Sequence, residues 1–192
     1  IAMAVEAYLS QKANFFSDMF VEKGLEILTY ALDGSPSLDI TTPEEILLAQ
    51  AGTMISLATT SSSLGLASLL SLTINSRYKM LKSLVSSILL PYMIEDISKY
   101  KSAKIVKLAK IMKCIPENEE ETLGDAEICK YFVDSLRERI AKANLPTRLK
   151  DLNLTIEQLS LAVEDVKQID FVNTLPRSMS TDDIFDFIKL AY

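Results

Sequence analysis

The chain has 192 residues, of which 48% are hydrophobic and 24% are charged, and its formal net charge is −6 at neutral pH. This composition is typical of a globular protein with one continuous core, and it excludes a disordered or fibrous chain. An acidic chain also lacks the broad positive footprint of nucleic-acid-binding proteins, so we expect no nucleic-acid partner.

Helical periodicity begins at the first residue. Residues 1–8 form a helical pattern that no capping residue and no initiating Met precede, which predicts a helix that starts in its middle and a chain that is part of a larger protein. The next helix carries Val21, Leu25, Leu28 and Leu32 on one predicted face. It should end at residues 33–36, where Gly permits a left-handed conformation and Pro fixes φ.

A third helix is predicted from the capping signal at residues 42–45. Thr42 is the expected N-cap, Pro43 suits the first helical position, and Glu45 would complete a capping box. Residues 46–76 then contain no charge, a run long enough to span a bilayer. Because hydroxyl residues occupy 59–63 and a Gly follows at 65, we expect a break between two buried helices and no membrane span.

The second half of the chain continues the helical pattern. A lysine-rich stretch over residues 99–113 should line the wet face of one helix. An acidic loop is predicted at residues 116–122, and the next helix should stop at Pro146. Capping signals at residues 155–158 and 180–183 open the last two helices. The lysines of the basic stretch are Lys99, Lys101, Lys104, Lys107, Lys110 and Lys113. Two apolar helical stripes are predicted, one formed by Ile105, Leu108, Ala109 and Met112 and the other by Ile128, Phe132, Leu136 and Ile140.

The sequence therefore predicts an all-α fold with seven or more helices, in a single helical domain over residues 1–192. No internal repeat of fixed period is visible. Two cysteines, Cys114 and Cys129, are too few for a disulfide framework. They indicate a reduced protein, and we expect a cytoplasmic location.

Chemistry-bearing motifs are few. The chain has no histidine, which removes the commonest general base and the imidazole ligand of most catalytic zinc and non-haem iron sites. It also has no Gly-rich phosphate loop and no Cys-x-x-Cys pair. A Ser-Lys dyad is chemically conceivable, since Lys79 and Lys82 are near Ser76 and Ser83, but surface and cap roles explain these residues equally well.

Nearly the whole chain resembles the C-terminal helical domain of the iron-containing alcohol dehydrogenases, in the dehydroquinate synthase-like superfamily. The matching segments are residues 5–10, 12–18, 63–66, 76–78, 87–91, 144–152, 173–177, 182–184 and 190–192. In that family, one Asp and three His bind a divalent metal, and NAD(P) exchanges a hydride at a domain cleft. The resemblance implies a helical domain that lacks the family's N-terminal dinucleotide-binding α/β domain.

The resemblance also implies that the metal ligands have been replaced. The first metal His falls on Met3, and the family's Asp would lie before residue 1. The second His falls on Ser68, a His near the nicotinamide falls on Leu72, and the last ligand falls on Lys82. A thioether, a hydroxyl and an ammonium cannot stand in for three imidazoles, so we expect no metal site and no catalytic residue. Without the resemblance, the same residues are ordinary helix positions.

Three functions stay open from the sequence. The first is a metal-site-degenerate, non-catalytic relative, a pseudoenzyme that acts as a structural or interaction module. The second is the C-terminal part of an NAD(P)-dependent oxidoreductase, with NAD(P) bound only if a missing domain or a partner α/β domain supplies its site, and with Lys82 assisting an alkoxide-like oxygen. The third is a domain that forms a homodimer through an exposed apolar surface. For each of these three functions, we expect the chain alone to be inactive and to hold no cofactor.

Overall fold

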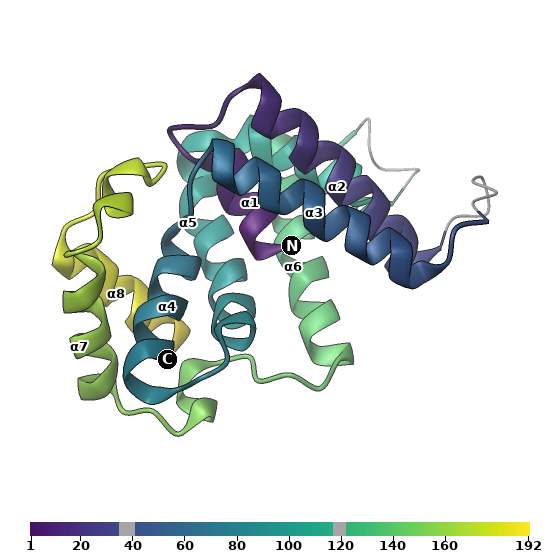
Figure 1. The fold of residues 1–192 in the computed structure, drawn as a ribbon. Helices are drawn as coiled ribbons and strands as arrows, with labels where there is room; N and C mark the ends of the chain where they lie inside the picture. Colours follow the sequence, from purple (N-terminus) through teal and green to yellow (C-terminus); the bar gives the residue numbers. More distant parts are fainter. Residues whose placement is uncertain (35–40, 117–121) are drawn as a thin grey trace.

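The computed structural model describes residues 1–34, 41–116 and 122–192 (Figure 1). All the regular secondary structure of these residues is helical, which confirms the predicted all-α fold. The elements in chain order are α1 (Ala2–Leu9), α2 (Phe15–Asp33), α3 (Glu44–Ser61), α4 (Leu66–Tyr78), α5 (Lys82–Ile111), α6 (Asp125–Lys142), η1 (Leu149–Leu152), α7 (Ile156–Val166), η2 (Asp170–Thr174) and α8 (Thr181–Ala191).

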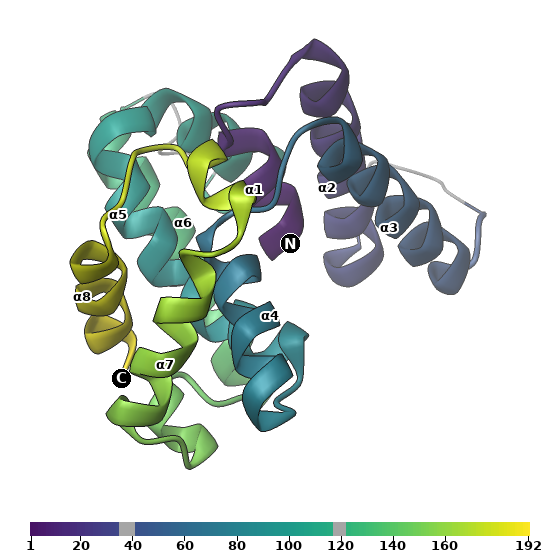
Figure 2. The ribbon, with the colours of Figure 1, turned by 60° about the vertical axis from the view of Figure 1, so that its left-hand side comes forward.

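Helix α1 lies at the centre of the molecule, although it is the shortest α-helix. Every residue from Ala4 to Leu9 is buried, and α1 contacts α2, α3, α4 and α5. Figures 1 and 2 show these neighbours placed around it on different sides. Because no side of α1 faces water over this stretch, its sequence has no polar stripe, as expected for a fully buried helix.

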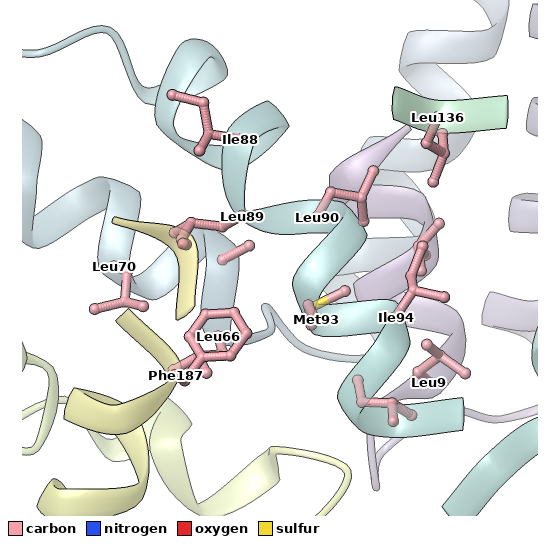
Figure 3. Close-up of a cluster of buried hydrophobic side chains, with 14 of the residues drawn as sticks. Leu9, Leu66, Leu70, Ile88, Leu89, Leu90, Met93, Ile94, Leu136 and Phe187 are labelled. Carbon is pink, nitrogen blue, oxygen red and sulfur yellow. The ribbon is translucent and has the colours of Figure 1, made fainter. Parts of the chain in front are cut away.

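The first part of α5 is the main support of the core. Its apolar side chains meet those of α1, α4, α6 and α8 in one cluster (Figure 3). The labelled members are Leu9, Leu66, Leu70, Ile88, Leu89, Leu90, Met93, Ile94, Leu136 and Phe187. Helix α5 contains Pro91, but its non-helical backbone occurs at Lys101, with φ −134° and ψ 43°. The bend therefore separates the core-forming part from the lysine-rich part that follows.

Helices α2 and α3 lie side by side and project from the rest of the molecule in both ribbon views (Figures 1 and 2). Helix α3 buries only one stripe, formed by Leu47, Ala51, Ile55 and Ala58. The prediction of two buried helices is therefore right for α4 and wrong for α3. The stripe facing α2 and α1 is covered, and most of the remaining residues of α3 are exposed. Leu32, at the end of α2, is likewise exposed, so the predicted apolar face of α2 is not buried along its whole length.

The uncharged run breaks where its hydroxyl cluster predicted. Helix α3 ends at Ser61, α4 begins at Leu66, and the two axes differ by 97°. Within the described ranges, no single helix has the length and apolar composition needed to cross a membrane. The bent pair α3 and α4 passes that test only when its two helices are taken together.

Local capping signals are mostly confirmed. Thr155 and Ser180 each accept a hydrogen bond from the third residue of their helix, and Gly34 ends α2 with a φ of 71°. The prediction for Thr42 is wrong: α3 begins at Glu44, because Leu47 donates its N–H to the carbonyl of Pro43, and no side chain caps it. Most of the predicted acidic loop, and the turn after Gly34, lie outside the described residues.

Two lysines of the predicted wet face have a different role. Lys101 Nζ donates to the carbonyl of Leu9, and Lys104 Nζ donates to the carbonyl of Tyr8, each at 2.8 Å. Both side chains are half-buried, so the wet-face prediction is wrong for them. The bend at Lys101 turns this part of α5 toward the C-terminus of α1. There the lysine ammonium groups stabilise carbonyls that have no partner within α1.

Candidate functional site

The joint between α3 and α4 is held to α1 and η2 by hydroxyl groups. Ser62 Oγ donates to the carbonyl of Ala7 at 2.7 Å, and the hydroxyls of Ser63 and Thr174 are 2.5 Å apart. The Asn14 side-chain amide donates to the carbonyl of Ser61 at 2.9 Å. These bonds connect segments far apart in the sequence, so the hydroxyl-rich stretch serves as a structural joint.

Glu6 is the most unusual polar residue of this region. Its side chain lies inside the protein with only 2% of the residue exposed, and its carboxylate faces the start of α4. Ser68 donates its backbone N–H to Oε1 at 2.9 Å and its hydroxyl to Oε2. The backbone N–H groups of Gly65 and Ala67 also favour the ionised form of this carboxylate. Because Gly65 offers no side-chain cap, Glu6 of α1 satisfies the orphan donors at the N-terminus of α4.

Burial and hydrogen bonding act on Glu6 in opposite directions. Burial, the larger effect, raises the pKa of Glu6 above its ordinary value, and the hydrogen bonds from Ser68 and from the backbone N–H groups of Gly65 and Ala67 oppose that rise.

The side chain of Glu6 is also tightly packed against Gly65. A Cβ at position 65 would lie 2.6 Å from Cγ of Glu6, so only glycine fits here. The φ of −107° suits any residue, and the requirement is therefore one of space.

A small cavity lies beside the Glu6 carboxylate. It encloses about 20 Å³ and is lined in part by Gly65, Met93, Asp96 and Arg177. Arg177 Nε donates to Asp96 Oδ2 at 2.9 Å. A volume of this size holds about one water molecule. It is too small for a substrate or a dinucleotide, so Glu6 has a structural environment and not that of a substrate-binding carboxylate.

The four residues that the resemblance singled out lie on three helices. Met3 belongs to α1, Ser68 and Leu72 to α4, and Lys82 is the first residue of α5. Met3 and Leu72 are 41% and 37% exposed, Lys82 is exposed, and Ser68 is buried. Across the described part of the chain, no hydrogen bond or ion pair joins these side chains to one another. The Ser68 hydroxyl is already bonded to Glu6.

These residues do not fit a catalytic divalent metal. The described ranges contain no group of three or more His, Cys, Asp or Glu side chains that could hold a metal ion. Glu6, the buried carboxylate beside Ser68, uses its oxygens to bind N–H and O–H donors of α4. The ammonium of Lys82 would repel a divalent cation placed near it. We therefore assign no chemical step to a metal in this chain.

Sequence reasoning missed the central role of Glu6. Its residue type was visible, since Glu6 is the one charged side chain within residues 1–10, a stretch that is otherwise apolar or hydroxylated. That contrast signals a charge whose partner must come from another element. The pattern could not show which element supplies the partner, because Ser68 lies 62 positions away in the chain.

The described residues form a helical domain in which the buried Glu6 of α1 binds the N-terminus of α4. The chain belongs to the Fe-containing alcohol dehydrogenase family, since the family model for the C-terminal region matches residues 1–192. This confirms the resemblance drawn from the sequence. No curated protein matches the chain at a significant level.

Solved structures show the same fold at low sequence identity. A 1,3-propanediol oxidoreductase superposes with a TM-score of 0.86 and 19% identity, over 100% of this chain and 49% of that chain. An alcohol dehydrogenase from Oenococcus oeni gives 0.87 and 19%, with the same coverage. An iron-containing alcohol dehydrogenase from Thermotoga maritima gives 0.70 and 17%, over 99% of this chain and 46% of that chain. The chain thus spans about half the length of these proteins.

Proposed function

We propose that this chain is a non-catalytic member of its family, with a degenerate metal site, and that it acts as a structural or interaction module. One observation carries the proposal. The Ser68 hydroxyl is bonded to the buried Glu6, and Ser68 is one of the three residues, with Met3 and Lys82, on which the resemblance places the family's metal ligands. None of these groups offers the neutral imidazole nitrogen that such a site uses.

Metal analysis tests this proposal directly. The chain is purified without chelators, incubated with Fe²⁺ or Zn²⁺, dialysed, and measured by elemental analysis. We expect far less than one metal ion per chain. Stoichiometric iron or zinc that is lost in a Lys82→Ala or Met3→Ala variant would contradict the proposal, since it would show that these positions hold a metal after all.

A second candidate function is supported by the length of the structural matches. Because the chain spans about half of the solved alcohol dehydrogenases, an α/β domain from a longer polypeptide or a partner could complete an NAD(P)-dependent oxidoreductase. Lys82 is exposed, and its ammonium has no partner among the described residues. In such an assembly it would stabilise an alkoxide-like oxygen.

The two candidates differ in cofactor binding. Under the leading proposal, titration of the chain into NADH leaves the fluorescence of the dinucleotide unchanged. A larger species that binds NADH, and that loses turnover in a Lys82→Met variant but not in Lys130→Met, would favour the oxidoreductase.

The cytoplasmic location also remains part of the proposal. It is supported by the two cysteines, which are both free thiols, with Cys129 buried and Cys114 half-buried. Free buried thiols are typical of a reducing compartment.

A further inference from the structure

A groove between α5, the end of α6 and the end of α8 combines apolar walls with a basic rim, and it is called the arginine groove here. Its volume is about 510 Å³, and its lining includes Ile88 and Pro91 of α5, which are both buried. Ile140 of α6 and Leu190 of α8 border the same space, and Leu190 is 71% exposed. A concave surface of this volume with apolar walls is typical of sites that bind small molecules.

The charged side chains that line the arginine groove among the described residues are two arginines, Arg137 of α6 and Arg148 of the segment that follows this helix. Arg148 is exposed, and its guanidinium forms no hydrogen bond or ion pair within the described ranges. Asp151 accepts a bond from the backbone N–H of Arg148, at 3.3 Å, and leaves the guanidinium free. Thr147 also lines the groove, is exposed, and has a hydroxyl without a partner in the described part of the chain. The rim therefore offers unused donors beside an apolar surface.

Arg137 is held in place but keeps donors for a ligand. Its Nη1 lies 2.9 Å from a carboxylate oxygen of Glu95 and 3.9 Å from one of Asp134. Its guanidinium carbon lies 5.5 Å from the centre of the Tyr92 ring, which also lines the groove. Both ion pairs use Nη1, whereas a guanidinium has five N–H donors. Because Glu95 balances the charge of Arg137, the uncompensated charge at the groove is that of Arg148.

We propose that the arginine groove binds a small carboxylate that carries an apolar chain. One uncompensated positive charge matches a monoanion better than a dianion, and the planar guanidinium of Arg148 can bind a carboxylate with two N–H donors. The apolar chain covers the buried walls and Leu190. A peptide fits less well, because its backbone N–H and C=O groups would be left without partners over apolar side chains. The inference goes beyond the proposed function, since none of the four residues that the resemblance singled out lines this groove.

Four probe molecules separate the role of the anionic head from that of the chain. Isothermal titration calorimetry is run on the full chain with octanoate, 1-octanol, octylammonium and acetate. Octanoate should bind at one site per chain, with an affinity at least about tenfold above that of each other probe, since only octanoate has both features. Equal binding of 1-octanol or octylammonium would overturn the anionic head, and equal binding of acetate would overturn the apolar chain. A lack of saturable octanoate binding up to about 10 mM would overturn the whole inference.

Two variants place the ligand in the groove. Arg148→Met keeps most of the stem but removes the charge, and it should weaken octanoate binding by about fivefold. Leu190→Ser removes an apolar wall and should weaken the binding by about threefold to tenfold. The matched controls are Lys150→Met and Leu161→Ser, two exposed residues outside the groove, and they should leave the affinity unchanged.

The four substituted side chains are all exposed, so each variant should keep the helical circular dichroism of the wild type. Octanoate binding that is as strong in Arg148→Met as in Lys150→Met would overturn the assignment of the head. Binding that is as strong in Leu190→Ser as in Leu161→Ser would overturn the assignment of the chain. The metal analysis concerns other residues, so this inference and the proposed function fail separately.

Discussion

Ser68 binds Glu6 twice, through its backbone N–H at 2.9 Å and through its hydroxyl, and thereby joins the start of α4 to the central helix α1. Both residues are buried. The carboxylate acts as the cap of a helix to which it does not belong. Ser68 therefore has a clear structural use, since it holds a buried carboxylate at the N-terminus of α4.

Removing the hydroxyl of Ser68 should destabilise the chain. Ser68→Ala loses a hydrogen bond to a buried carboxylate, and we expect the free energy of unfolding to fall by about 1.5–3 kcal/mol. The matched control is Ser71→Ala, also buried in α4, whose hydroxyl donates only to the carbonyl of Ser68. It should cost less than about 1 kcal/mol. Urea unfolding followed by circular dichroism measures both, and equal losses would contradict the special role of the Glu6 contact.

The buried carboxylate should make stability depend on pH. Because burial raises the pKa of Glu6 above its ordinary value of 4.5, the folded chain holds this proton after the unfolded chain has released it. The stability contributed by Glu6 is therefore fully present below the ordinary pKa and is lost as pH rises through the folded pKa. Other carboxylates titrate as well, so the difference between wild type and Glu6→Gln isolates this effect.

We expect the stability of the wild type, relative to Glu6→Gln, to decline as pH rises from about 4.5 and then to level off. Ser68→Ala removes a bond that favours the ionised form, so it should extend the decline to higher pH. Unfolding free energies from urea titrations at several pH values give the comparison. Curves for wild type and Glu6→Gln that stay parallel over the whole range would show that Glu6 keeps an ordinary pKa.

Two glycines should respond to alanine in opposite directions. Gly65→Ala places a Cβ against Cγ of Glu6, a side chain fixed by its hydrogen bonds, and should destabilise by about 1–3 kcal/mol. Gly52→Ala has no atom within 4 Å of the new Cβ and lies on the exposed side of α3. It should stabilise by about 0.5–1 kcal/mol, since alanine favours a helix interior. Thermal unfolding of the two variants decides the matter, and a stabilising Gly65→Ala would disprove the close contact.

The lysines of α5 that bind the C-terminus of α1 should contribute more to stability than the exposed lysines of the same helix. Lys104 donates to the carbonyl of Tyr8 and to Asp18, and its ammonium lies 4.5 Å from the centre of the Tyr8 ring. Lys104→Met keeps the apolar stem but loses these contacts, at a cost of about 1–2 kcal/mol. Lys99→Met removes a long surface contact of 3.7 Å to Asp96 and should cost less than about 0.5 kcal/mol. Equal losses of unfolding free energy in the two variants, measured by chemical denaturation, would contradict this role of Lys104 and would agree with an exposed position on the wet face of the helix.

Local chemistry explains where sequence prediction succeeded. The caps at Thr155 and Ser180, the end of α2 at Gly34 and the break after Ser61 all depend on bonds or conformations within a few residues. Such signals can be read without knowing what packs on the helix. Thr42 is an exception, because the first helical bonds begin at the carbonyl of Pro43 and no side chain caps α3.

The sequence by itself determined the helical class, most helix ends and the lack of any imidazole for a metal site. The tertiary structure decided which apolar and charged residues are covered. Leu32 and the outer faces of α3 are exposed because the pair α2 and α3 projects from the body, whereas Lys104 is drawn inward by the end of α1. Glu6 found its partner only through folding. Periodicity and capping act over a few residues, but burial depends on elements that the chain brings together from far apart.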